Sequence, residues 1–91
     1  MPLTKRFTFT TKLQRGNRLQ IPRYVRWLCQ LETNQILKTT IQVINLWNGP
    51  QTFLTRMGKD GRITIPKLIM HLLGMEENED RYVLHVILDP A

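Results

Sequence analysis

A duplication runs through this chain and limits the folds open to it more than any other feature. Residues 18–22 match residues 62–66 at an offset of 44, and the ungapped match pairs residues 8–44 with residues 52–88. Nine matched positions are identical, and in the first copy they are Thr8, Phe9, Thr11, Arg18, Ile21, Pro22, Leu28, Glu32 and Asn34. A half of this size can scarcely bury a core alone. We therefore expect the two halves to fold together.

Each copy opens with two short strands joined by a tight turn. Residues 7–11 alternate aromatic and hydroxylated side chains, which is the period of a strand with one buried face. Glycine with asparagine or aspartate follows in both copies and favours the positive φ of a turn. The expected elements are strands at 7–11 and 51–56, turns at 14–17 and 58–61, short strands at 18–21 and 62–65, and closing strands at 36–47 and 82–88.

A short helix follows the second strand of each copy. Pro22 and Pro66 suit the first turn of a helix, where the missing N–H has no partner to lose. We therefore expect helices at about 22–30 and 66–73, each with one buried face. The predicted buried residues are Tyr24, Val25, Leu28 and Cys29 in the first helix and Leu68, Ile69, Leu72 and Leu73 in the second.

These elements predict a mainly β fold with two short helices. Residues 48–50, Asn-Gly-Pro, break the chain between the copies, and so short a linker disfavours two independent domains. We expect a single pseudo-twofold domain over 1–91, with repeat one at about 7–47, the linker at 48–50 and repeat two at about 51–89. The halves should interlock into one barrel-like β domain.

One string carries a resemblance to a known family. Gly-Arg-Ile-Thr-Ile-Pro at 61–66 lies between a predicted strand and a short helix that ends Leu-Leu-Gly at 72–74. This arrangement resembles the AbrB/SpoVT/MazE group of swapped-hairpin DNA-binding proteins, and the resemblance covers nearly the whole chain, twice. It implies a swapped-hairpin AbrB-like β-barrel formed by two fused half-domain repeats. The first copy departs from the pattern, with Asn17 in place of glycine and Cys29-Gln30 in place of Leu-Gly.

Positive charge is concentrated on the same segment of both copies. The net charge is +6; residues 12–26 contribute +5, residues 56–70 contribute +3, and all other residues sum to −2. The basic positions match across the copies as Lys12/Arg56, Arg15/Lys59, Arg18/Arg62 and Arg23/Lys67. Pseudo-twofold packing would gather these segments into one cationic strip, which suits the phosphates of double-stranded DNA.

This strip supplies the candidate DNA-binding residues, and the resembling family uses the same region. Those assigned to the loops are Lys12, Arg15, Arg18, Arg56, Lys59 and Arg62, and those assigned to the helices are Arg23, Arg26 and Lys67. Two alternatives stay open. Basic turns often form a solvated face only, and Arg18 and Arg62 can support the loops instead, because they precede buried strand residues. The sequence does not separate contacts to bases from contacts to phosphates.

The remaining aromatic and reactive side chains are assigned structural roles. Trp27 and Trp47 are expected to pack in a core or an interface, with base stacking as the alternative. Cys29 is expected in the core. His71 and His85 have no second ligand at metal spacing, and no catalytic set is convincing. We therefore expect no enzyme activity, no metal and no cofactor.

Together these patterns predict a non-enzymatic DNA-binding protein, either a transcription regulator or a small chromatin-associated factor. A single cysteine and the lack of a long apolar run favour a cytoplasmic, nucleoid-associated protein with no membrane partner. The alternative is a protein-interaction module or an accessory subunit of a larger replication or transcription assembly. Further self-association and docking on such an assembly are left open.

Overall fold

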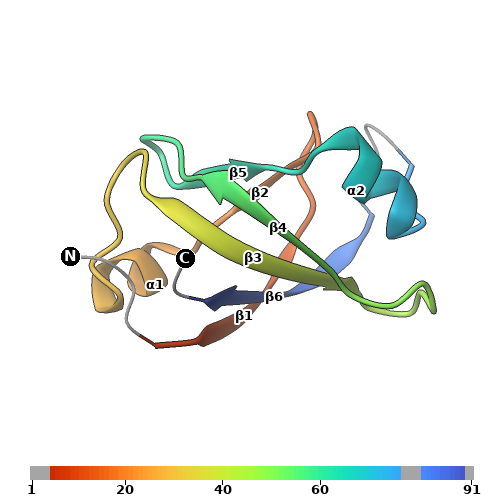
Figure 1. Cartoon of the computed structure of the whole chain (residues 1–91), viewed down its shortest axis with the longest axis horizontal. Coiled ribbons are helices and arrows are strands. Elements are labelled where there is room, and N and C mark those ends of the chain that lie inside the picture. Colours follow the sequence, from red (N-terminus) through yellow and green to blue (C-terminus); the bar gives the residue numbers. More distant parts are fainter. Residues whose placement is uncertain (1–4, 77–80, 90–91) are drawn as a thin grey trace.

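Strands dominate the architecture. The computed structural model describes residues 5–76 and 81–89, and these form six strands and two helices (Figure 1). In chain order the elements are β1 (Phe7–Lys12), β2 (Arg18–Gln20), α1 (Arg23–Leu28), β3 (Ile36–Val43), β4 (Gln51–Arg56), β5 (Arg62–Thr64), α2 (Lys67–Leu72) and β6 (Val83–Asp89). The predicted mainly β fold with two short helices is confirmed.

Local backbone geometry sets the ends of these elements. β4 has the predicted bounds, whereas both helices are shorter than expected and begin one residue after the prolines. Pro22 and Pro66 have ψ values of 145° and 146°, so they precede the helices in extended backbone. β3 ends at Val43, and the chain then turns through Asn45, whose φ is 73°. The predicted continuation of this strand to Trp47 is wrong.

Each strand pairing joins the two repeats. The four-stranded antiparallel sheet has the order β1-β6-β3-β4, so the first strand of each repeat lies beside the closing strand of the other. The closing strands β3 and β6 pair at the centre, and β2 pairs with β5 in a separate two-stranded ribbon. Within the described residues, no strand pairs with another strand of its own repeat. The sheets therefore exist only when both repeats are present.

The two repeats correspond less simply than the ungapped match implies. The Leu13 amide donates to the Tyr82 carbonyl (2.9 Å), and the Met57 amide donates to the Gln35 carbonyl (3.1 Å). Leu13 and Met57 are 44 residues apart, but Gln35 and Tyr82 are 47 apart. The ungapped match is thus wrong over the last strand, where the second copy has gained three residues. Side chains alternate between the two faces of a strand, so a shift by an odd number of residues exchanges the inward and outward sets. The ungapped alignment therefore matched the inward residues of β3 with outward residues of β6.

The core lies between the four-stranded sheet and the β2–β5 ribbon. The ribbon contributes Leu19 and Ile63, both fully buried, and they pack with the inward residues of β3 and β6. The fully buried inward residues of the closing strands are Leu37, Thr39, Ile41, Leu84, Val86 and Leu88. This packing fixes the ribbon against one face of the sheet (Figure 1). On the other face, Lys38, Gln42 and His85 of the closing strands are exposed.

The helices bury less than their sequences predict. Val25 is the buried residue of α1, and Met70 is that of α2. Tyr24 and Leu28 are more than half exposed, and so is Leu68; Leu72 is also exposed and Cys29 is half-buried. The predicted burial is wrong for Tyr24, Leu28, Leu68 and Leu72, because each helix is only six residues long and directs one of its residues into the core. It is confirmed for Val25 and Leu73, and Cys29 and Ile69 are half-buried and packed against the core. Neither helix has the length and hydropathy of a membrane span, and no other helix occurs in the described residues.

Candidate nucleic-acid interface

The outward face of the β2–β5 ribbon presents two arginines together. Leu19 pairs with Ile63 at the centre of the ribbon, and both point inward. The flanking pairs are Arg18 with Thr64 and Gln20 with Arg62, and all four of these side chains belong to the opposite, outward face. Arg18 and Arg62 are therefore diagonal neighbours, a relation that places residues roughly 7–8 Å apart.

The two predicted basic loops leave from opposite ends of this ribbon. The Ile65 amide donates to the Asn17 carbonyl (2.7 Å), and the Ile21 amide donates to the Gly61 carbonyl (2.9 Å). Four residues separate position 17 from position 21, so the bases of the loops are roughly 13 Å apart. Figure 1 shows both loops on the side of the sheet that carries the ribbon. The turns of the two repeats thus share one side of the molecule.

Positive φ angles allow the loops to turn tightly. In the first loop they occur at Gly16 (79°) and Asn17 (57°), and in the second at Gly61 (80°). Asp60 does not take a positive φ, so the expected role of aspartate in this turn is wrong and Gly61 alone performs it. Arg15 and Lys59, next to the loop tips, are exposed.

The nine candidate residues do not all lie on this surface. The exposed ones are Lys12, Arg15, Arg18, Arg23, Arg56, Lys59 and Lys67, and the half-buried ones are Arg26 and Arg62. Lys12 and Arg56 precede the buried residues Leu13 and Met57, so their own side chains belong to the solvent face of the four-stranded sheet. The structure therefore places them away from the ribbon. The alternation of inward and outward side chains along β1 and β4 is the sequence pattern that could have separated Lys12 and Arg56 from the other candidates.

The starts of the helices extend the basic surface. Arg23 follows Ile21 by two residues, and Lys67 follows Ile65 in the same way. Because Ile21 pairs with Gly61 and Ile65 pairs with Asn17, each helix begins beside the loop of the other repeat. The ribbon, the loop tips and the helix starts are thus neighbours on the basic surface.

The loop at 57–61 is held by side chains from both repeats. The side chain of Arg26 lies over Gly61, so closely that a Cβ there would come within 2.6 Å of its Cδ. Asp60 forms an ion pair with Arg62 (Oδ2 to Nη1, 3.0 Å), and its carbonyl accepts a hydrogen bond from Gln20 Nε2 (2.7 Å). Arg62 therefore supports the loop while it lies on the ribbon face. Met70 occupies the position that matches Arg26 and is buried, so the two ends of the ribbon differ.

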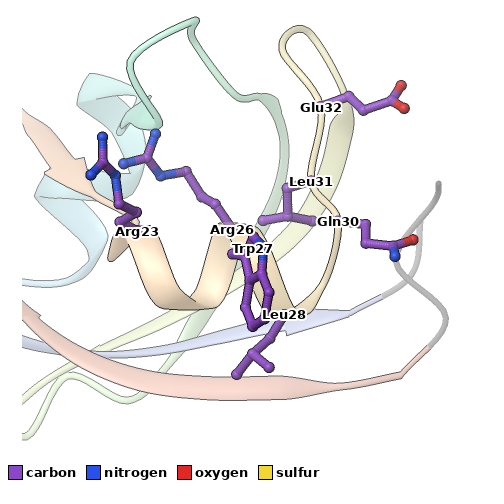
Figure 2. A pocket seen from close by; sticks show the side chains of 7 residues that line it. All are labelled: Arg23, Arg26, Trp27, Leu28, Gln30, Leu31 and Glu32. Carbon is purple, nitrogen blue, oxygen red and sulfur yellow. The ribbon is translucent and has the colours of Figure 1, made fainter.

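An open hollow of about 770 Å³ lies beside this end of the ribbon, lined by Arg23, Arg26, Trp27, Leu28, Gln30, Leu31 and Glu32. Figure 2 shows Arg23 and Arg26 extending their guanidinium groups toward the loop, while Trp27 and Leu28 lie on another side of the helix. The Nε atoms of Arg26 and Arg62 are buried and have no hydrogen-bond partner among the described residues. An oxyanion is the acceptor that a guanidinium binds most strongly.

Both tryptophans lie on the surface. Trp27 is 78% exposed and Trp47 is 97% exposed, so the prediction that they pack in the core is wrong. Trp27 falls on the solvent side of α1, and Trp47 lies beyond the turn that ends β3. Packing in an interface and stacking on bases both remain as predictions. Burial raises the pKa of the Cys29 thiol, which favours the unreactive protonated form.

Histidine, cysteine and acidic residues do not gather into a site. Residues 5–76 and 81–89 contain no group of three or more His, Cys, Asp or Glu side chains that could hold a metal ion. His71 and His85 are both exposed, on α2 and on β6. The distinctive chemistry of the described surface is therefore the grouping of guanidinium and ammonium side chains around the ribbon.

The same fold occurs in a solved structure. The chain is similar to PHS018 from Pyrococcus horikoshii, known from a solution structure, with 26% sequence identity and a TM-score of 0.77. The match covers 99% of this chain and 92% of the Pyrococcus protein, so it includes both repeats. No family model matches the chain, and no curated protein matches it.

Proposed function

We propose that this protein is a fused, single-chain relative of the AbrB/SpoVT/MazE-type swapped-hairpin proteins and binds double-stranded DNA without catalysing a reaction. The observation that carries the proposal is the outward face of the β2–β5 ribbon, which presents Arg18 and Arg62 beside Gln20 and Thr64. A transcription regulator or a small nucleoid-associated chromatin factor in the cytoplasm fits such a surface.

The chemistry of the ribbon suits the major groove. A two-stranded β-ribbon is one of the elements that this groove, about 12 Å wide, admits. Arginine binds the O6 and N7 atoms of guanine in this groove, and threonine can contact the edges of different bases. The Gln20 side-chain amide instead donates to the Asp60 carbonyl and supports the loop. Arg15 and Lys59, on loops whose bases are roughly 13 Å apart, would then contact the flanking phosphates.

The pairing of strands supports the finer description of the fold. In a swapped hairpin, each half contributes strands that complete the sheet of the other half. The pairs β1–β6 and β3–β4 have this character, and the ribbon that packs on the inner face of the sheet is consistent with a barrel-like closure.

A second candidate function is favoured by the apolar surface. Tyr24, Trp27 and Leu28 form an exposed apolar group on α1, which is unusual for a small soluble protein. This group is the observation that supports a protein-interaction module or an accessory subunit of a replication or transcription assembly.

Removing one cation from each loop tip tests the DNA-binding function. The double change Arg15→Ala/Lys59→Ala should weaken duplex binding and leave the fold intact, because both side chains are exposed. In a mobility-shift assay over a salt series, we expect a slope of log affinity against log salt of about −4 to −8 for the natural chain and a slope shallower by about 2 for the variant. A natural chain that binds no duplex even at low salt would favour the interaction module instead.

Removing the charge of Asp60 should strengthen binding. Asp60 neutralises Arg62 and repels phosphate, so Asp60→Asn is expected to raise duplex affinity roughly threefold to tenfold and to steepen the salt slope by about 1. The matched control is Asp89→Asn, which removes one acid from the ion pair with Arg6, away from the ribbon. Fluorescence anisotropy should show little change for this control. Equal gains for both variants would mean that net charge alone governs binding.

A further inference from the structure

β1 and β4 are the two edges of the four-stranded sheet, and their outer backbone groups are unpaired. The Met57 amide donates to the Gln35 carbonyl, and ladder bonds recur at every second residue, so Gln51, Phe53 and Thr55 bond to β3. The amides and carbonyls of Thr52, Leu54 and Arg56 therefore point away from the sheet. In the described part of the chain, no hydrogen bond uses these groups.

The two edges have different chemistry although they are equivalent in the pseudo-twofold arrangement. On β1 the matched residues are Thr8, Thr10 and Lys12, a polar and charged set that discourages pairing. On β4 the central position carries Leu54, which is 66% exposed and lies near Ile36, itself 44% exposed. These two side chains line an open hollow with Thr55 and Arg56. β4 keeps a threonine and a cation at the matched positions Thr52 and Arg56, so it differs from β1 in carrying an exposed leucine where β1 has Thr10.

We propose that a second copy of this chain pairs with β4, antiparallel and centred on Leu54. In this register Leu54 lies opposite Leu54 of the second copy, and Thr52 lies opposite Arg56 in both directions. All outward amides and carbonyls of the three residues then find partners, giving six backbone hydrogen bonds. The two exposed leucines cover each other, and the two sheets become one continuous sheet of eight strands.

The placement of charge is compatible with a second copy. The two Arg56 residues are separated by four residues along the paired strands, roughly 13 Å. Lys38 pairs with Leu54 from the next strand, so the two Lys38 residues are three strand spacings apart, roughly 14 Å. Both separations exceed the Debye length of about 8 Å at physiological salt. Six-residue edges bury less than the roughly 1,200 Å² of a stable interface, so the dimer is weak and depends on concentration.

Sedimentation velocity without DNA tests this pairing. The natural chain should shift from monomer to dimer as its concentration rises, and added salt should strengthen the dimer because it screens two chains of charge +6. Salt weakens DNA binding but should strengthen the dimer. The salt dependence therefore distinguishes a failure of the proposed dimer from a failure of the proposed DNA binding. Leu54→Thr, which copies the residue that β1 has at this position, should weaken the dimer at least tenfold. Leu68→Thr, an equally exposed leucine on α2, should leave it unchanged.

Amide hydrogen exchange supplies a backbone measurement of the same contact. The amides of Thr52, Leu54 and Arg56 should become more protected as concentration rises, while those of Thr8, Thr10 and Lys12 should not. A chain that stays monomeric throughout, a Leu54→Thr variant that associates as well as the natural chain, or protection on β1 instead of β4 would each overturn the proposal.

Discussion

Replacing Arg18 and Arg62 together by alanine is expected to lower the affinity for duplex DNA by roughly 30-fold to 10,000-fold. Both side chains lie on the outward face of the ribbon, one strand apart. A bidentate arginine–guanine contact contributes about 1–3 kcal/mol, and each 1.4 kcal/mol is a factor of ten in affinity. Fluorescence anisotropy at one fixed salt concentration measures the loss, and circular dichroism checks that the variant is folded.

A charge-matched variant separates a specific surface from general attraction. Lys5→Ala/Lys38→Ala removes the same two charges from exposed positions outside the ribbon. This variant should retain affinity within about threefold, since distant exposed charges are largely screened at physiological salt. If it weakens binding as much as the arginine variant does, the ribbon is not the contact surface. Arg62→Ala also removes the ion pair with Asp60 that supports the loop. The single variant Arg18→Ala leaves that ion pair in place, so it measures the loss of a DNA contact without a change in the loop.

Truncating the inward residues of the ribbon should produce the largest loss of stability. Leu19 and Ile63 are fully buried and face each other across β2 and β5. Removing a buried Leu or Ile side chain to alanine costs about 2–5 kcal/mol, and small domains have only about 5–15 kcal/mol of unfolding free energy. We expect Ile63→Ala to lower the urea midpoint sharply and Leu19→Ala/Ile63→Ala to leave the chain near its unfolding threshold.

Leu68→Ala provides the comparison for these core variants. Leu68 has the size of a core residue but is 67% exposed on α2, so its truncation should change the unfolding free energy by no more than about 0.5 kcal/mol. Urea unfolding followed by circular dichroism measures both. Equal losses for Ile63→Ala and Leu68→Ala would contradict the packing of the ribbon against the sheet.

Local elements were predictable from the sequence because local chemistry determines them. The duplication, the turns and the strands at β1, β2, β4 and β5 follow from alternation and from glycine and asparagine positions. Which strands pair does not follow from such patterns, since pairing joins residues far apart in the chain. The three residues gained before Tyr82 were hidden because β3 and β6 are both rich in apolar residues and align at several offsets.

The candidate site was predictable where a residue's place in a turn or a strand decides its exposure. Arg15, Arg18, Lys59 and Arg62 lie on the ribbon side for that reason. Lys12 and Arg56 were grouped with them by charge alone, although strand alternation directs them to the other face of the sheet. The position of Arg26 over Gly61 depends on the reach of a long side chain across two repeats, which periodicity does not describe.

The difference between the two ends of the ribbon gives this molecule a direction. A pair of identical chains must present the same loop twice, and any substitution appears at both ends. Here one covalent chain provides both halves, so Arg26 can cover Gly61 at one end while Met70 is buried at the matched position. A duplex lying along the ribbon would contact two chemically different ends. The two orientations of the protein on that duplex would therefore differ in binding energy.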